Sequence, residues 1–376
     1  MVTEQQVARA LEHVRLPASG QTLAASGRLS EIVVSGDKVM VAIAIDATEA
    51  AAMEPVRLAA QSAISGLPGV GQVFVSLTAD RPQSKAAPSP RPQVTPGRPQ
   101  QAPSPKAAMI PGVRHVIAIA SGKGGVGKST TACNLALALA SQGLKIGILD
   151  ADIYGPSLPK LFGLHGKPRV IEGRTLAPLE GFGVKVMSIG FMVDEETPMI
   201  WRGPMVMSAI TQMLREVAWG DLDVLVVDMP PGTGDAQLTM AQATPLAGAV
   251  IVSTPQDLAL IDARRGVAMF RKTEVPILGI VENMSYFIAP DTGKRYDIFG
   301  HGGARREADR LGVPFLGEVP LDMNLRERSD TGQPIVATEP DGPQAQVYQE
   351  MARLVWASLA GDGPVKMRTP PRIIFE

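Results

Sequence analysis

The fold is decided by the stretch Ser121-Gly122-Lys123-Gly124-Gly125-Val126-Gly127-Lys128-Ser129-Thr130, which contains the phosphate-loop pattern G-x-x-x-x-G-K-S/T. The apolar run 115–120 before it predicts a buried strand, and residues 131–140 after it predict a helix. Glycines let such a loop bend until its backbone N–H groups point at phosphate oxygens, and the following helix adds the positive end of its dipole. The stretch therefore predicts a nucleotide-binding loop between a strand and a helix.

Several side chains of this loop have predicted roles. Lys128 is expected to reach the β- and γ-phosphates, and the Ser129 hydroxyl is expected to ligate Mg²⁺. A second lysine, Lys123, is not required by the ordinary pattern. Either it neutralises phosphate charge on a facing subunit, as an arginine finger does, or it is a solvated lysine at the mouth of the loop. Nucleotide contacts are predicted for Gly122, Lys123, Gly124, Gly125, Val126, Gly127, Lys128, Ser129 and Thr130.

The bulk composition favours a soluble globular protein of one large or two smaller domains. The chain has 376 residues, of which 45% are hydrophobic and 19% charged, and its formal net charge is -1. That balance gives no global field to recruit nucleic acid, and no apolar run is long enough to span a membrane. Residues 1–6 lack the basic and apolar regions of a signal peptide, so a cytoplasmic location is expected. Cys133 is the only cysteine, which excludes an intrachain disulfide.

Residues 1–80 predict a small α+β domain. Helical patterns cover residues 4–14 and 49–64, and two β-branched runs flank the turn Ser35-Gly36-Asp37-Lys38, which predicts a hairpin. A further strand is expected at 70–77. No cluster of His, Asp or Glu has metal-ligand spacing there, so the domain is interpreted as an interaction or scaffold module.

Residues 81–112 are rich in Pro, Ser, Gln and Ala and contain basic but no acidic side chains. Such a segment cannot bury a core, which predicts a disordered spacer. A Pro-rich ligand for another domain is the alternative. Residues 363–376 form a predicted C-terminal tail, whose prolines exclude an amphipathic membrane helix.

Residues 113–362 alternate apolar strand patterns with helical ones. This rhythm predicts an α/β fold with a mostly parallel phosphate-loop NTPase sheet covered by helices on both faces, preceded by the small α+β domain. In such sheets ligands bind at the carboxyl ends of strands. The predicted strands are 116–120, 146–149, 184–189, 224–227, 249–253, 277–281 and 315–317.

Polar residues follow three of these strands. Asp150-Ala151-Asp152 closes the second, where a carboxylate can position a water or hold Mg²⁺; Asp152 is the first choice and Asp150 the second. Asp228 closes the strand 224–227 and is predicted to act on Mg²⁺ directly or through water. Asn283 follows the strand 277–281, and its side-chain amide can read the edge of a purine base.

The loop with its early lysine resembles that of the MinD/ParA/ArsA-type ATPases, and residues 112–360 resemble more closely the Mrp family of ATP-binding iron–sulfur cluster carriers. The resemblance implies an ATPase that binds ATP and Mg²⁺ and acts as a homodimer, with Lys123, Lys128 and Asp152 as catalytic residues and Lys123 acting across the dimer. Apo iron–sulfur client proteins or assembly factors are the implied partners, and residues 1–80 are similar to a domain of such factors. The matching stretches are 150–157, 201–205, 228–235, 282–285 and 298–303.

One departure concerns the cluster itself. Many members carry Cys-x-x-Cys shortly after the Glu-Asn-Met-Ser stretch, whereas this chain has Ala289 and Thr292 at those positions. A cluster held by cysteine alone needs four thiolates, and a dimer offers only its two copies of Cys133, which is expected to be a packed core thiol. Asp291 is a possible oxygen ligand, and His301 is expected to be a loop residue. No iron–sulfur ligand set is therefore found.

Two other functions remain open. A MinD/ParA-like positioning ATPase would bind a membrane or DNA, but the near-neutral charge and the proline-containing tail argue against both, so no nucleic acid and no membrane partner are expected. A nucleotide-gated adaptor, in which the N-terminal module binds a client and the dimer is the signal, fits the missing cysteines.

Overall fold

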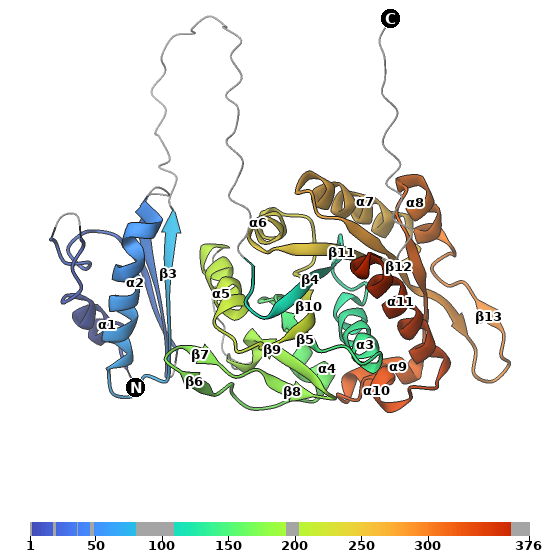
Figure 1. The fold of residues 1–376 in the computed structure, drawn as a ribbon, viewed down its shortest axis with the longest axis horizontal. Helices are drawn as coiled ribbons and strands as arrows, with labels where there is room; N and C mark the ends of the chain where they lie inside the picture. Colours follow the sequence, from blue (N-terminus) through green and yellow to red (C-terminus); the bar gives the residue numbers. More distant parts are fainter. Residues whose placement is uncertain are drawn as a thin grey trace, which may run out of the picture. The chain divides into compact units, whose positions relative to one another are not determined.

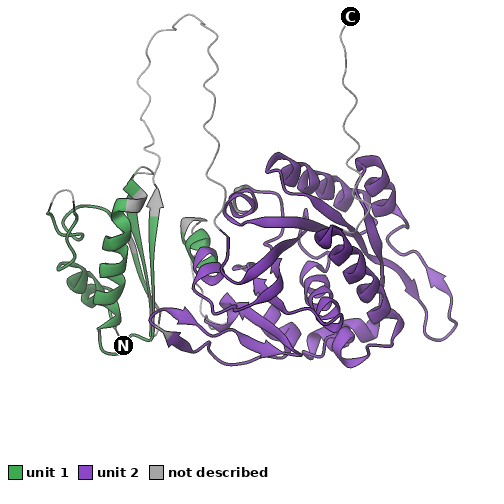
Figure 2. Ribbon diagram, viewed as in Figure 1, with its two compact units in different colours: residues 1–105, 196–210 green, residues 106–195, 211–376 purple. Residues whose placement is uncertain are grey.

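The structure is a computed structural model that describes residues 2–17, 20–35, 37–45, 49–79, 109–192 and 203–361. The chain divides into two compact units, residues 1–105 with 196–210 and residues 106–195 with 211–376 (Figure 2). The predicted spacer, apart from residues 109–112, and the predicted tail 363–376 lie outside the described residues.

The N-terminal unit contains a three-stranded sheet with the order β1-β2-β3, formed by β1 (Leu29–Ser35), β2 (Lys38–Ile45) and β3 (Gln72–Ala79). The predicted hairpin is confirmed, because β1 and β2 pair antiparallel. β3 is parallel to β2, which requires the crossover helix α2 (Ala50–Ser65) between them. Alternate residues of β2, among them Val39, Val41 and Ile43, belong to the core with α2.

The first helix, α1 (Glu4–Leu11), is shorter than predicted. It begins at a capping box between Thr3 and Gln6, which satisfies two backbone donors at its start. It ends at Leu11 rather than at Val14, because the chain turns there and Leu23 donates to the Val14 carbonyl.

The larger unit contains a nine-stranded sheet in the order β13-β12-β11-β4-β10-β5-β9-β8, with β14 also paired to β12. All seven predicted strands are present, and the pairs among them are parallel, which confirms the fold class. The short edge strands β8 (Leu179–Gly181) and β13 (Arg295–Tyr296) are antiparallel and were not predicted. The central strands are β4 (Val113–Ala120), β5 (Ile146–Asp150), β9 (Val184–Ser188), β10 (Leu222–Asp228), β11 (Leu246–Ser253), β12 (Ile277–Ile288) and β14 (Phe315–Leu321).

Helices cover both faces of this sheet (Figure 1). On one face, α3 (Lys128–Ser141) and α11 (Pro343–Ala360) pack with Ile117, Ile148 and other alternate strand residues in one core cluster. On the other face lie α7 (Asp257–Lys272) and α8 (Gly303–Leu311), which contact β11 and β12. Further elements of this unit are α4 (Leu158–Phe162), α6 (Asp235–Ala243), α9 (Met323–Asp330), α10 (Ile335–Thr338), the short helix Ile189–Phe191 and the ribbon of β6 (Val170–Glu172) and β7 (Thr175–Leu176). The residues of α5 (Gly203–Arg215) are divided between the two units.

The carboxyl ends of β4, β10 and β5 lie side by side. Asp228 at the end of β10 is in register with Ile119 of β4 and Asp150 of β5. The phosphate loop and the Asp150-Ala151-Asp152 segment therefore flank Asp228 at one edge of the sheet.

β12 is longer than the predicted strand 277–281 and continues to Ile288. Asn283 is consequently inside the strand and does not close it. Met284 has a positive φ of 55°, and the register with β14 shifts between Asn283 and Phe287, so the strand is irregular at this point. Among the described residues, no helix combines the length and the apolar character needed to cross a membrane.

Candidate active site

The phosphate loop, residues 121–127, connects the end of β4 to α3, and two of its glycines are required by geometry. Gly127 caps α3 in the left-handed conformation with a φ of 79°. A Cβ on Gly122 would overlap the backbone carbonyl of Asp262 in α7, so any other residue would push the loop away from that helix. The loop is therefore packed closely against α7 at Gly122.

Lys128 is buried between carboxylates. Its Nζ donates to Asp228 Oδ1 at 2.6 Å and to Ser129 Oγ at 3.2 Å, and it lies 3.8 Å from Asp152 Oδ2. The Lys128 side chain is 6% exposed and Asp228 is fully buried, so each charge depends on the other for compensation. A bound phosphate would offer the ammonium an alternative anionic partner at the same place.

The oxygens beside Lys128 fit a magnesium ion. Asp228 Oδ2 is buried and has no hydrogen-bond partner among the described residues, while Oδ1 is occupied by Lys128. An unpartnered buried carboxylate oxygen is costly unless something binds it, and hard oxygen ligands are what Mg²⁺ prefers. Ser129 Oγ, which lies within 3.2 Å of the same ammonium, supplies a second oxygen. The possible magnesium ligands Ser129 and Asp228 therefore both lie beside the Lys128 ammonium, and Asp152 is nearby.

Asp152 is the less buried carboxylate of the group. Its side chain is 13% exposed, and its backbone N–H donates to Asp150 Oδ1 at 3.1 Å, which fixes the turn after β5. Burial raises the pKa of Asp152, Lys128 lowers it and Asp228 raises it, with a net increase. A carboxylate of raised pKa with access to solvent can accept a proton from water.

Asp150, the second choice for positioning water, has a different role. Its carboxylate accepts hydrogen bonds from the N–H groups of Ser157 and Leu158, from the Ser188 hydroxyl and from Asp152 N. It is fully buried, and burial followed by the charge of Asp228 raises its pKa to about 7. Since its oxygens are already used, Asp150 anchors the 151–157 loop and the start of α4 rather than orienting a water.

Lys123 is half-buried in the loop, and its carbonyl accepts from the Ser121 hydroxyl at 2.9 Å. Within the described part of the chain its ammonium makes no ion pair. Gly124 and Gly125 beside it are exposed, so this side of the loop faces outward. The geometry is compatible with both predicted interpretations of Lys123.

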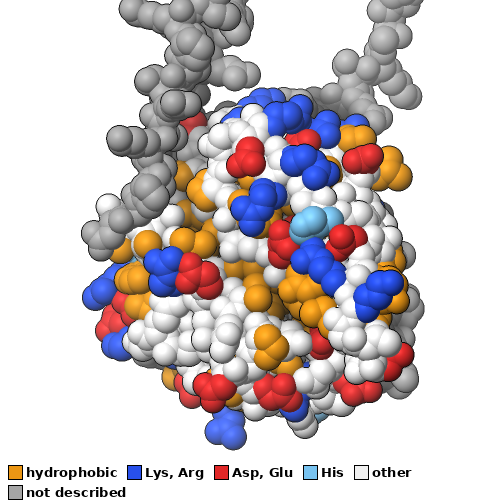
Figure 3. Space-filling view, turned by 90° about the vertical axis from the view of Figure 1, so that its right-hand side faces the viewer, with side chains coloured by type: hydrophobic (Ala, Val, Ile, Leu, Met, Phe, Trp, Pro, Cys, Tyr) orange, Lys and Arg blue, Asp and Glu red, His pale blue; other side chains and the backbone are white. Residues whose placement is uncertain are grey.

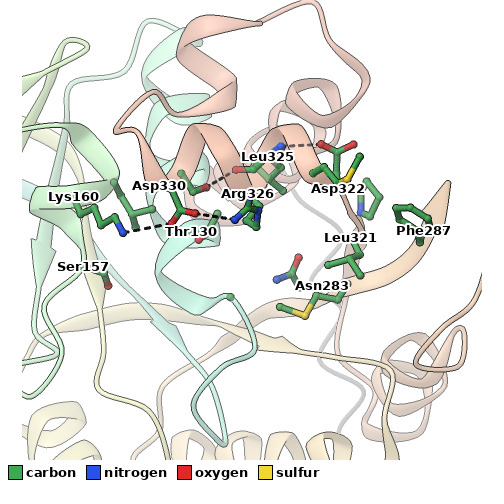
Figure 4. Close-up of a pocket in the computed structure, with 16 residues that line it drawn as sticks. Thr130, Ser157, Lys160, Asn283, Phe287, Leu321, Asp322, Leu325, Arg326 and Asp330 are labelled. Carbon is green, nitrogen blue, oxygen red and sulfur yellow. Dashed lines mark hydrogen bonds and ion pairs between the residues drawn. The ribbon is translucent and has the colours of Figure 1, made fainter. Parts of the chain in front are cut away.

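A cavity of about 520 Å³ begins where the loop joins α3 (Figure 4). Gly127 and Thr130, where the loop joins α3, are among its lining residues. Apolar side chains line most of it, and charged side chains lie at α4 and α9. The lining residues include Leu161, Asn283, Met284, Phe287, Leu321, Leu325, Lys160, Arg326 and Asp330.

Asn283 lines this cavity, but its amide also has a structural partner. Nδ2 donates to the Val126 carbonyl in the phosphate loop at 2.8 Å, which ties β12 to the loop. The predicted contact with a purine base remains a prediction. The residues of α9 were missed, because no motif marks them. The sequence could have indicated them only by position. They follow β14, which is parallel to the other central strands, so its carboxyl end lies at the same edge of the sheet as the phosphate loop.

The positions of the missing cysteines lie between β12 and β13. Ala289 is buried and Thr292 is exposed, as is Asp291. Cys133 is 1% exposed in α3, and burial, followed by the charge of Asp228, raises the pKa of its thiol. The expectation that Cys133 is a core thiol is confirmed.

A group of Glu282, His301 and Glu318 has ligand atoms within 4.8 Å of one another, but all three already have hydrogen-bond or ion-pair partners. Glu282 accepts from Ser285 Oγ and from the N–H groups of Gly302 and Ala304, so it caps the start of α8. Arg295 lies 2.7 Å from His301 Nδ1 and 3.8 Å from Glu318. Figure 3 shows this face of the molecule, where basic and acidic side chains are interspersed with apolar ones. The group is interpreted as a link between β12 and α8.

Comparison with known proteins gives two family matches. Residues 112–356 match the family described as NUBPL iron-transfer P-loop NTPase, and residues 4–77 match the family described as iron-sulfur cluster assembly protein. The chain is 43% identical over 360 residues to an iron-sulfur cluster carrier protein of Synechocystis, covering 94% of this chain and 97% of the relative. It is 54% identical over 250 residues to the iron-sulfur cluster transfer protein NUBPL of Mus musculus, covering 66% and 78%.

Two solved structures are also similar. A nucleotide-binding protein of Archaeoglobus fulgidus in complex with ADP is 43% identical, with a TM-score of 0.55 over 62% of this chain and 91% of that one. The septum site-determining protein MinD of Pyrococcus horikoshii, complexed with Mg-ADP, has a TM-score of 0.50 at 21% identity, covering 67% and 100%. The second likeness concerns the fold alone.

Proposed function

This chain belongs to the family of NUBPL iron-transfer P-loop NTPases and is an ATPase, and we propose that it couples the binding and hydrolysis of ATP to iron–sulfur cluster transfer or assembly. The observation that carries the proposal is the meeting of Lys128 and Ser129, which follow the glycine-rich loop, with Asp152 after β5 and Asp228 at the end of β10. The similar protein of Archaeoglobus fulgidus in complex with ADP supports an adenine nucleotide as the ligand.

The chemistry follows from these residues. We expect Lys128 to exchange Asp228 for phosphate oxygens when ATP binds, while backbone N–H groups of the loop hold the remaining oxygens. Ser129 and Asp228 would hold Mg²⁺, which neutralises phosphate charge when bound. Asp152 orients a water and accepts its proton, because it is the carboxylate with solvent access. The adjoining cavity takes the nucleoside, with Asn283 at its wall.

The proposal includes a homodimer in which Lys123 acts on the nucleotide of the partner. Supporting it are the outward-facing side of the loop and the lack of an ion pair at Lys123 within the described residues. A cytoplasmic location and partners that are apo iron–sulfur proteins or assembly factors belong to the same proposal. Residues 4–77, which match the assembly-protein family, are the proposed contact for them.

A nucleotide-gated adaptor without its own cluster is the second candidate, and one observation favours it. Ala289 and Thr292 cannot supply thiolates, and the single cysteine, Cys133, is buried in α3. Under this alternative, ATP controls the dimer and the client supplies the cluster ligands.

Lys128→Ala is expected to weaken ATP binding by about 10- to 100-fold or more, since a charge-assisted contact to phosphate is lost. Calorimetric titration with ATP and Mg²⁺ measures the loss, and thermal unfolding reports whether the unpaired Asp228 has destabilised the fold. Lys272→Ala, an exposed lysine at the end of α7, is the control. Unchanged affinity in Lys128→Ala would show that the loop does not hold the phosphates.

Asp152→Asn is expected to leave ATP bound but to lower kcat by about 100-fold, the usual scale for a lost general base. In the wild type the rate of hydrolysis should increase with pH as Asp152 loses its proton. Because the pKa of Asp152 is raised, this increase should occur at a higher pH than for an ordinary aspartate. Steady-state hydrolysis across pH tests both points, with the exposed Asp291→Asn as control. A variant that keeps the wild-type rate and pH profile contradicts the assignment.

Lys123→Ala is expected to bind ATP normally but to hydrolyse it at least about tenfold more slowly. Mixing Lys123→Ala with Lys128→Ala separates the two interpretations of this lysine. A mixed dimer has one site with its own Lys128 and a partner Lys123, so action across the dimer predicts that turnover recovers on mixing. A mixture that stays as slow as the separate variants argues for action within one subunit or for no dimer.

Anaerobic reconstitution of the purified chain with iron and sulfide is expected to give no stable cluster, because two buried thiols cannot replace four accessible thiolates. Visible absorbance and the content of protein-bound iron are the readouts, with an apo ferredoxin as the positive control. A stable cluster on the chain alone would eliminate the adaptor hypothesis and require ligands other than a Cys-x-x-Cys pair.

A further inference from the structure

The mouth of the cavity next to the phosphate loop has a cation that is loosely held. Arg326 on α9 lines the cavity, and its guanidinium lies 3.4 Å from Asp330 Oδ2 and 3.9 Å from Glu327 Oε1. The Arg326 side chain is 68% exposed, and those of Asp330 and Glu327 are 51% and 71% exposed. Exposed ion pairs of this kind contribute little to stability, so Arg326 can leave Asp330 at low cost.

Other parts of the cavity wall are held by hydrogen bonds, although Lys160 on α4, which lies 3.5 Å from Asp330 Oδ1, is an exposed cation like Arg326. Asn283 is bound to the Val126 carbonyl at 2.8 Å, and Asp322 caps α9 by accepting from Leu325 N at 2.8 Å. Asn134 in α3 donates to the Thr130 carbonyl of the same helix and accepts from Val336 N, so α10 is tied to the phosphate-loop helix. Arg326 is thus a long, exposed side chain on α9, joined to Asp330 by an exposed ion pair (Figure 4).

The chemistry of the cavity suits a planar heteroaromatic ring. Apolar side chains such as Met284, Phe287 and Leu321 remove one face of a ring from water. A guanidinium is planar and stacks on aromatic faces, including those of nucleobases. An arginine at the open side of an apolar slot can therefore cover the face of a base that the wall leaves exposed.

We propose that Arg326 is a base-contacting residue, which exchanges Asp330 for the face of the purine ring when a purine nucleoside triphosphate binds. The inference rests on the proposed binding of ATP at the phosphate loop and names a residue that the loop motif does not contain. Arg326 adds affinity for the nucleoside and not for the phosphates.

The test compares Arg326→Gln with the wild type for two ligands, ATP and inorganic tripolyphosphate, each with Mg²⁺. Titration calorimetry should show ATP affinity reduced by about 2- to 30-fold, the range of a cation–π contact, while tripolyphosphate affinity is unchanged. Arg353→Gln is the matched control, because Arg353 also makes an exposed helical ion pair, with Glu350 on α11. Equal losses for both ligands would show that Arg326 acts through charge on the phosphates and would overturn the proposal.

Asp330→Asn supplies an independent measurement that does not depend on tripolyphosphate. It releases Arg326, and also Lys160, which lies 3.5 Å from Asp330 Oδ1, without removing either, so ATP affinity should stay the same or increase. A decrease like that of Arg326→Gln would mean that the ion pair merely shapes the cavity, and would overturn the proposal. If the wild type itself fails to bind ATP, the proposed function fails; if it binds ATP and Arg326→Gln binds equally well, only the role of Arg326 fails.

Discussion

The buried contact between Lys128 and Asp228 is the constraint on which the site depends. A lysine that is 6% exposed needs an anionic partner, and Asp228 provides it at 2.6 Å. Removing one member of such a buried pair typically costs about 3–5 kcal/mol. The pair exists only because β10, which ends in Asp228, lies directly between β4, which leads into the loop, and β5, which leads to Asp152. The order of these three strands therefore determines which side chains of the site lie next to one another.

Much of this arrangement was predictable from local sequence. The loop residues 122–130 form a pattern whose glycines and lysine have defined physical roles, and apolar strands of four to six residues are clear on either side. Because parallel strands present their carboxyl ends at one edge, the meeting of Asp152 and Asp228 near Lys128 follows once the strands are recognised. The N-terminal hairpin was predictable for a similar local reason, since its turn residues separate two β-branched runs.

What could not be predicted depends on contacts between distant segments. Asp150 and Asp152 stand in the same short motif, yet Ser157, Leu158 and Ser188 occupy the carboxylate of Asp150 and leave that of Asp152 accessible. The bend at Met284 lets β12 continue past Asn283, although that stretch resembles a strand end. The cavity draws residues from α4, β12 and α9, whose side chains have no shared sequence pattern.

The short helix α4 connects the hydrolysis site to the cavity. At five residues it is too short to be stable by itself, so it is held by Asp150 at its start and by the burial of Leu158, Leu161 and Phe162. Lys160 on the same helix lies 3.5 Å from Asp330, at the mouth of the cavity. Because Asp150 holds both the 151–157 loop and the start of α4, a displacement of that loop would be transmitted to α4, the helix that carries Lys160. The 151–157 loop, α4 and the cavity wall are therefore connected within one chain, whereas the one cysteine of the sequence, Cys133, is buried in α3.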